Sequence, residues 1–213
     1  MTVEEKDGMN LRENQLTQAK AALRKSVAAR QPEERLLRQE SAALCGVLNA
    51  WQPLRRARTV AAFMPMANEP QLAPLLSLLL TEGKQVAFPR CSSLGVMQFC
   101  PVVSLRHLVR GKYGILAPRD DAQAMDLSAL DVMLVPLAAA DRFGGRLGKG
   151  GGFYDRVLAN YQGTACGVVL AHQWVNRVSM GTLDMPLRYL ADAQDVWDVT
   201  ESAEGKERSN GQA

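Results

Sequence analysis

A glycine-rich segment with interleaved basic residues is the part of the sequence best suited to chemistry. Six glycines fall within residues 144–152, together with Arg146 and Lys149. The segment follows an apolar run at 132–137 that is typical of a buried strand, and it precedes a run from Tyr154 that favours a helix. A strand, a glycine loop and a helix in succession direct backbone N–H groups toward an anion, most often a phosphate.

The loop differs from the two common phosphate-binding patterns. A Walker loop has Ser or Thr directly after its Gly-Lys pair, whereas Gly150 stands there in this chain. A dinucleotide-binding fingerprint that started at Gly148 would need a small residue where Phe153 stands. Phe153 and Tyr154 indicate that an aromatic or pterin-like ring lies in reach, and Asp155 supplies a carboxylate of the kind that a magnesium ion beside phosphates requires.

This segment resembles the signature of a known enzyme family. The motif R-L-G-x-G-x-G-[YF]-Y-D of the 5-formyltetrahydrofolate cyclo-ligases, also called methenyltetrahydrofolate synthetases, is similar to the run Arg146-Leu147-Gly148-Lys149-Gly150-Gly151-Gly152-Phe153-Tyr154-Asp155. The motif is long and unusual, and the resemblance extends from Lys20 to about Val199. It implies that residues 146–154 bind ATP, that Phe153 and Tyr154 also contact the folate, and that Asp155 binds Mg²⁺.

The resemblance also implies a reaction. The family converts 5-formyltetrahydrofolate and ATP into 5,10-methenyltetrahydrofolate, ADP and phosphate, with Mg²⁺ required. Phosphorylation of the formyl oxygen turns a poor leaving group into phosphate, which departs after N10 has added. Such an enzyme needs alignment and positive charge rather than a nucleophile of its own. Arg146 and Lys149 are the catalytic candidates, and Lys20 and Arg24 add further charge.

Lys20 and Arg24 lie on one face of a helix that the apolar spacing predicts from Leu11 to Arg30, after a disordered segment at 1–10. Two cations four residues apart repel each other by roughly 0.2–0.5 kcal/mol unless an anion or water relieves them. From the residues alone, the simplest interpretation is a solvated helix edge. The resemblance implies instead that both side chains contact the nucleotide phosphates.

The loop that follows an apolar strand at 59–64 holds two more candidates, Met64 and Glu69. Loops at the carboxyl ends of parallel strands are where α/β proteins bind ligands. Glu69 could also be a carboxylate that interacts with the dipole at the start of the helix expected at 72–80. The resemblance implies that Glu69 holds the folate and that Met64 lines the same pocket.

Two positions leave alternatives open. Family members often have a second magnesium ligand where Arg188 stands in this chain, so Asp184, Asp192 or water would have to take that place. His172 follows a buried strand predicted at 165–171, where it is either a capping side chain or a functional one.

Composition favours a cytoplasmic protein whose partner is a polyanionic small molecule rather than a nucleic acid. The chain has 213 residues, 47% hydrophobic and 22% charged, and a net charge of +3, which is low for a nucleic-acid binder. The cysteines lack paired spacing, so reduced thiols are expected. Without an 18-residue apolar stretch or a signal peptide, neither a membrane nor a secretory route is predicted. We expect a monomer.

The order of elements predicts one α/β domain over 11–200, with a mainly parallel central sheet flanked by helices and with two helices preceding it. Residues 201–213 contain few apolar side chains and are expected to be disordered. Three other interpretations compete with the enzyme: a binding homologue that has lost turnover, a phosphosugar isomerase or transferase on a similar sheet, and a purely structural glycine turn. The last requires six glycines that each cost about 0.5–1 kcal/mol in unfolded-state entropy.

Overall fold

The computed structural model describes residues 3–92, 95–111 and 114–200. Seven strands form one sheet in the order β11-β10-β9-β6-β1-β2-β3. The parallel strands are β1 (Thr59–Ala61), β2 (Gln85–Cys91), β6 (Val132–Val135), β9 (Thr164–Val168) and β10 (Tyr189–Ala191). The antiparallel strands at the two edges are β3 (Met97–Val102) and β11 (Val196–Asp198). The prediction of an α/β fold with a mainly parallel central sheet is therefore confirmed.

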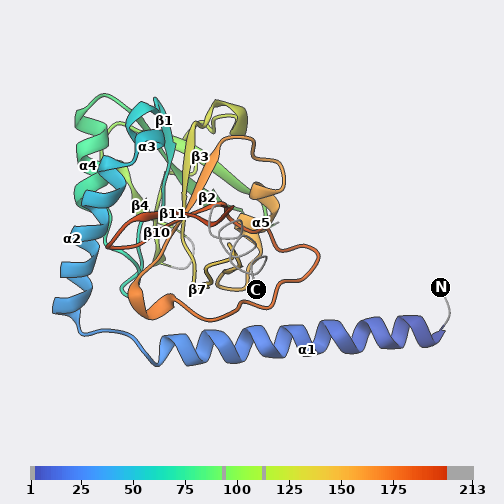
Figure 1. The fold of residues 1–213 in the computed structure, drawn as a ribbon. Helices are drawn as coiled ribbons and strands as arrows, with labels where there is room; N and C mark the ends of the chain where they lie inside the picture. Colours follow the sequence, from blue (N-terminus) through green and yellow to red (C-terminus); the bar gives the residue numbers. More distant parts are fainter. Residues whose placement is uncertain (1–2, 93–94, 112–113, 201–213) are drawn as a thin grey trace.

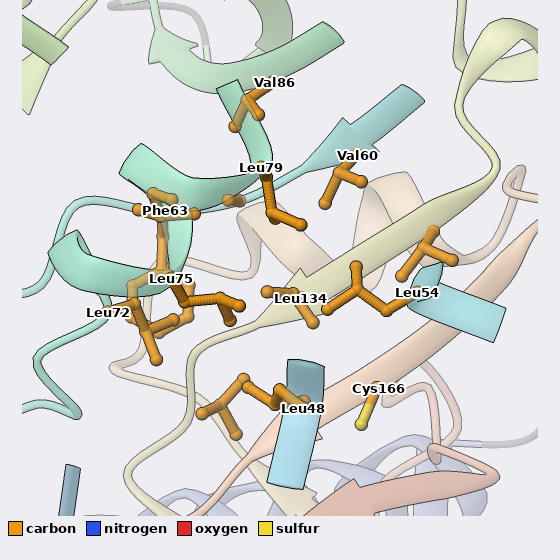
Figure 2. Close-up of a cluster of buried hydrophobic side chains, with 14 of the residues drawn as sticks. Leu48, Leu54, Val60, Phe63, Leu72, Leu75, Leu79, Val86, Leu134 and Cys166 are labelled. Atoms are coloured by element: carbon orange, nitrogen blue, oxygen red, sulfur yellow. The ribbon is translucent and has the colours of Figure 1, made fainter. Parts of the chain in front are cut away.

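Alternate residues of the central strands enter two cores on opposite faces of the sheet. Leu134 of β6 packs with α2 (Glu34–Ala50) and α4 (Ala73–Thr81), as Figure 2 shows for a part of this first core. Met133 and Val135 enter the second core, which α5 (Phe153–Leu158) covers. In Figure 1, α2 and α4 lie together on one side of the sheet and α5 on the other. Burial on both faces explains why these strands are uniformly apolar.

Helix α1 (Val3–Ala28) begins earlier than the sequence indicated. Residues 3–10, expected to be disordered, are helical, and the N-terminal part of α1 extends away from the sheet and its flanking helices (Figure 1). Acidic residues at positions 4 and 5 suit the first turn of a helix, and no proline interrupts the chain before Pro32. The expectation of disorder at 201–213 falls outside the described residues.

The second half of α1 is fastened to the rest of the chain. Val27 is buried, and with Leu23 it packs against Ala139 and Leu147. These two partners belong to a short antiparallel ribbon made of β7 (Ala139–Ala140) and β8 (Arg146–Leu147). The face of α1 that carries the predicted basic pair is thereby brought to the glycine loop.

One connecting segment forms an element of its own. Residues 52–56 form a short helix, α3 (Gln52–Arg56), whose Leu54 side chain is buried. The remaining elements are β4 (Val109–Arg110), β5 (Leu116–Ala117) and the 3₁₀ turns Leu105–His107, Leu127–Ala129 and Ala171–Gln173.

Truncation of a buried side chain on the central strand β6 tests this packing. Leu134→Ala removes a fully buried side chain from the first core, so we expect the free energy of unfolding to fall by about 2–5 kcal/mol. Leu78→Ala is the matched control, because Leu78 on α4 is 40% exposed and its truncation should cost far less. Urea denaturation followed by circular dichroism measures both changes, and equal losses would contradict the two-core arrangement.

Candidate functional site

The buried carboxylate of Asp141 holds the start of the glycine loop. Its Oδ1 accepts hydrogen bonds from the backbone N–H groups of Phe143 (2.9 Å) and Gly145 (2.9 Å), and its Oδ2 accepts one from Val178 (2.8 Å). Asp141 is 1% exposed, so these bonds replace the water that a carboxylate otherwise requires. Sequence reasoning did not identify Asp141, although an Asp three residues before a Gly-Gly pair is a recognisable turn signal.

Glycine is required at particular positions of the loop. Gly150 has φ of +105° and Gly152, which caps the N-terminus of α5, has φ of +63°; both values are strained for other residues. A Cβ on Gly148 would lie 3.0 Å from Nη1 of Arg146, and one on Gly150 would lie 3.7 Å from Cζ of Arg24. The glycines therefore let the backbone lie directly against two guanidinium groups.

Arg146 and Asp155 form an ion pair beneath this loop. Arg146 comes from β8 and is 3% exposed, and Asp155 comes from the first turn of α5. Asp155 Oδ1 also accepts a hydrogen bond from the N–H of Met185 (3.2 Å). Within the described part of the chain, Nε of Arg146 is buried without a hydrogen-bond partner. A buried donor that lacks a partner is well suited to an anionic ligand.

Both predicted cations of α1 reach the loop region. Arg24 Nε donates to the carbonyl oxygen of Gly148 (2.8 Å), and Lys20 forms an ion pair with Asp184. Both side chains are partly buried, so the simple solvated helix edge is wrong. Arg24 and Arg146 thus approach the same turn of the loop from two different elements.

Lys149 joins the loop to the candidate folate residue. Its Nζ lies 2.6 Å from Oε1 of Glu69 and 2.9 Å from Sδ of Met66. The other carboxylate oxygen of Glu69 accepts the N–H of Met66 (2.7 Å), and the Glu69 side chain is 7% exposed. Met64 lies at the start of the same loop, half-buried against the first core. Residues expected to hold phosphate and residues expected to hold the folate are therefore in direct contact.

Tyr154 lies between these groups. Its hydroxyl oxygen is buried without a hydrogen-bond partner among the described residues. Burial raises the pKa of this phenol above its ordinary value, the neighbouring Glu69 and Cys91 add to the rise, and Arg146 opposes it. The hydroxyl therefore stays protonated and available as a donor or an acceptor for a ligand. Phe153, its neighbour, packs against Gly151.

Arg188 has a structural role at the edge of the sheet. Its Nη2 lies 2.7 Å from Oδ2 of Asp198 on the adjacent strand β11, and hydrogen bonds from Arg188 lower the pKa of Asp198 to about 2. Asp192 Oδ2 already accepts a hydrogen bond from Trp174 Nε1 (3.0 Å) and forms an ion pair with Nη2 of Arg142 (3.6 Å). Asp184 precedes Met185, whose N–H reaches Asp155, so of the two substitutes it lies on the segment that contacts the site.

The described residues contain no group of three or more His, Cys, Asp or Glu side chains that could hold a metal ion. A metal at Asp155 would accordingly take most of its ligands from phosphate oxygens and water, which is usual for Mg²⁺. Oδ2 of Asp155 makes no hydrogen bond to the described residues, whereas Oδ1 is engaged by Arg146 and Met185. The carboxylate therefore fits a magnesium ion with one free oxygen.

His172 lies apart from the glycine loop, in the 3₁₀ turn after β9. Burial, with help from the positive charge of Arg30, lowers the pKa of its imidazole. Its Nδ1 is buried and unpartnered within the described residues, and the adjacent Ala171 N–H donates to Glu40. All four cysteines are free, as their spacing predicted. None of the described helices is both long and apolar enough to cross a membrane.

Comparison with known proteins agrees with the motif. A sequence model described as the 5-formyltetrahydrofolate cyclo-ligase family matches residues 4–191. The chain belongs to this family. It is 36% identical over 154 residues to the 5-formyltetrahydrofolate cyclo-ligase of Escherichia coli (strain K12), with 70% of this chain and 85% of that one covered. It is 30% identical over 142 residues to the enzyme of Haemophilus influenzae, with 62% and 74% covered.

Solved structures of the family share the fold. The 5,10-methenyltetrahydrofolate synthetase of Aquifex aeolicus superposes with a TM-score of 0.76 at 27% identity, over 84% of this chain and 92% of that one. The Mycoplasma pneumoniae protein of the same name superposes with a TM-score of 0.67 at 18% identity, over 82% and 99%, which supports the fold alone. Family membership thus rests on the sequence and on the architecture.

Lys149 is the loop cation at which an effect of substitution on turnover can best be separated from an effect on stability. Its side chain is 48% exposed, whereas Arg146→Ala would leave Asp155 without its buried partner and would also cost stability. We expect Lys149→Met to lower kcat/KM about 10- to 100-fold, because a hydrogen bond to a charged group contributes roughly 1.5–3 kcal/mol. The free energy of unfolding should fall by about 1 kcal/mol, less than for Arg146→Ala, because the lost ion pair is half-exposed and Glu69 keeps its hydrogen bond from the N–H of Met66.

Lys25→Met is the matched control for this substitution, because Lys25 is an exposed lysine in the last turn of α1. It should keep wild-type kinetics. Steady-state assays and thermal melts compare the wild-type protein with Lys149→Met and Lys25→Met. Unchanged kinetics in Lys149→Met would show that Lys149 does not belong to the site.

Proposed function

We propose that this protein catalyses the ATP- and Mg²⁺-dependent cyclisation of 5-formyltetrahydrofolate to 5,10-methenyltetrahydrofolate, with release of ADP and phosphate. The observation that carries the proposal is the contact between Lys149 of the glycine loop and Glu69 of the loop after β1. It supports a single cavity in which a phosphate donor and a folate meet. Family membership supplies the class of reaction.

The residues suit transfer of a phosphoryl group to a formyl oxygen. The formamide oxygen leaves poorly until it carries phosphate, so N10 can displace it only after that transfer. Positive charge around the transferring group stabilises the transition state. We assign this role to Arg146 and Lys149, and we assign ATP binding to Lys20, Arg24 and residues 146–154. The buried Nε of Arg146 supports the assignment, because a phosphate oxygen would supply its missing acceptor.

The folate is assigned to the other side of Lys149. Glu69 is almost fully buried and presents a carboxylate that can accept hydrogen bonds from the N–H groups of a pterin. The buried hydroxyl of Tyr154, with Phe153 and Met64, would complete this pocket. A ligand that displaced Lys149 from Glu69 would also free the ammonium group to turn toward phosphate.

We assign the magnesium ion to Asp155. When bound there, the ion would neutralise charge on the phosphate oxygens. Asp155 would hold it with the oxygen that the ion pair leaves unused, while Arg146 and the N–H of Met185 keep the carboxylate oriented. Asp184 is the nearest candidate for a second carboxylate, and its present partner is Lys20.

The competing functions have less support. The only hint of a binding homologue without turnover was Arg188, and the ion pair of Arg188 with Asp198 gives that residue a structural purpose away from Asp155. A phosphosugar enzyme would need a catalytic carboxylate and no ATP, whereas Glu69 and Asp155 are both paired with cations of the glycine loop region. We also propose that the enzyme acts as a monomer in the cytoplasm, in keeping with its modest net charge and free thiols.

Glu69→Gln should impair use of the folate while sparing ATP. An amide presents an N–H₂ group to the pterin where a carboxylate oxygen would accept, and an unpaired buried donor costs about 1–3 kcal/mol. We therefore expect the KM for 5-formyltetrahydrofolate to rise about 5- to 100-fold and the KM for ATP to stay within about twofold. Glu82→Gln, at an exposed carboxylate after α4, is the control. A rise confined to the KM for ATP would show that Glu69 serves the nucleotide.

Substrate labelled with ¹⁸O at the formyl oxygen tests the chemical step. Direct phosphorylation transfers the γ-phosphoryl group to this oxygen, and the later loss of phosphate breaks the bond between carbon and that oxygen. The label should therefore appear in inorganic phosphate, as measured by mass spectrometry. The glycine loop contains neither serine nor cysteine, so no covalent enzyme intermediate is expected. Label recovered in water, or a phosphoenzyme trapped by rapid quench, would contradict the step.

A further inference from the structure

Met66 is the most exposed methionine among those whose side chains the structure describes. It is 40% exposed, whereas Met97 and Met133 are buried and the other described methionine side chains are half-buried. Met66 lies in the loop after β1, between Met64 and Glu69. Oxidation of a thioether follows its exposure, so a dissolved oxidant would attack Met66 before the others.

The backbone of Met66 is fixed to the segment that carries Glu69. Its N–H donates to Oε2 of Glu69 (2.7 Å), and its carbonyl oxygen accepts from the backbone N–H of Glu69 (3.0 Å) and from Nε2 of Gln71 (3.2 Å). These three bonds hold the main chain of Met66 in place. A chemical change on the side chain therefore acts where the sulfur lies, because the loop is not free to move it elsewhere.

The sulfur atom of Met66 lies against the ammonium group of Lys149. Sδ is 2.9 Å from Nζ, and Oε1 of Glu69 is 2.6 Å from the same nitrogen. A thioether is a weak hydrogen-bond acceptor, so the carboxylate is the stronger partner while the sulfur is reduced. An oxygen added to this sulfur would carry partial negative charge and would lie within reach of the ammonium group, because the sulfur already does.

We propose that Met66 is a site of reversible oxidation by hydrogen peroxide, and that its sulfoxide holds Lys149 away from the phosphates of ATP. A lone pair of Sδ attacks one peroxide oxygen, and an S–O bond forms as the O–O bond breaks and hydroxide leaves. Transfer of the proton from the new S–OH group to that hydroxide gives the sulfoxide and water. The sulfur loses the two electrons that the peroxide gains.

The effect on ATP rests on the proposed function, because it takes Lys149 as a phosphate ligand. Lys149 has to turn from Glu69 toward phosphate when the substrates bind, and the sulfoxide of Met66 places a second strong acceptor beside its ammonium group. Oxidation would therefore weaken ATP binding and lower turnover. The hydrogen bond from the N–H of Met66 to Glu69 would persist, because oxidation leaves the backbone unchanged.

The test treats the purified protein with hydrogen peroxide, removes the peroxide with catalase, and then adds dithiothreitol to reverse disulfides and sulfenic acids at the cysteines. Peptide mass spectrometry gives the oxidation rate of each methionine, titration calorimetry gives the dissociation constant for ATP, and steady-state assays give turnover. Met66 should be oxidised faster than Met125, which is half-buried against the second core. The dissociation constant for ATP should then rise about 3- to 10-fold, the range that one hydrogen bond supplies.

Reduction of the sulfoxide should restore the affinity. Methionine sulfoxide reductases of the two classes, one for each epimer at sulfur, are added together after the dithiothreitol step. They act on methionine sulfoxide and leave sulfinic and sulfonic cysteine unchanged, so recovery identifies a methionine as the cause.

Substitutions assign the effect to Met66 and to Lys149. Met66→Leu removes the sulfur, keeps the backbone bonds to Glu69 and conserves side-chain volume, so peroxide should leave its ATP affinity unchanged. Met125→Leu is the matched control and should lose affinity as the wild-type protein does. In Lys149→Leu, which introduces no additional methionine, oxidation of Met66 should have no further effect on ATP affinity.

The outcomes separate this proposal from the proposed reaction. Equal oxidation rates at Met66 and Met125, unchanged ATP affinity once Met66 is oxidised, or an equal loss of affinity in Met66→Leu or Lys149→Leu overturns the proposal and leaves the reaction standing. A loss of ATP affinity that the reductases reverse, in a protein that forms no methenyl product, supports the proposal and overturns the reaction. Failure to bind ATP before oxidation overturns both.

Discussion

The buried ion pair between Arg146 and Asp155 is the interaction on which the site depends. A guanidinium that is almost fully buried needs a compensating charge, and removal of one partner from such a pair typically costs 3–5 kcal/mol. The pair joins β8 to the first turn of α5, so it closes the glycine loop at both ends. It also leaves Nε of Arg146 and Oδ2 of Asp155 without a hydrogen-bond partner among the described residues, and these are the two atoms that we propose for phosphate and magnesium.

The rest of the site is assembled from segments that are far apart in sequence. Arg24 of α1 contacts the carbonyl of Gly148, and Lys149 of the loop contacts Glu69 after β1. Asp141 connects the beginning of the loop to the backbone at Val178. Because α1 is fastened mainly through Leu23 and Val27, the position of its basic pair depends on a small apolar cluster rather than on the sheet.

Two departures from simple expectation have the same physical origin, which is the need to compensate charge. Arg188 stands where the family resemblance implied a second metal ligand, and here its guanidinium stabilises the edge of the sheet through Asp198. Lys149 and Glu69, which we assign to different substrates, neutralise each other by direct contact. Substrates would therefore exchange existing ion pairs for new ones, and the site avoids isolated buried charges before they arrive.

The buried central strands and the glycine loop could be predicted from the sequence alone, because buried strands such as 132–135 are apolar on both faces and loop positions with positive φ favour glycine. The early start of α1, helix α3, and strand β10 were not predicted, since short or polar elements carry weak periodicity and depend on their neighbours. Which charged side chains form ion pairs is visible only in the tertiary structure. The hydrogen bonds of Asp141 and the Lys149–Glu69 contact arise from residues brought together by the fold, and spacing along a chain does not encode such distances.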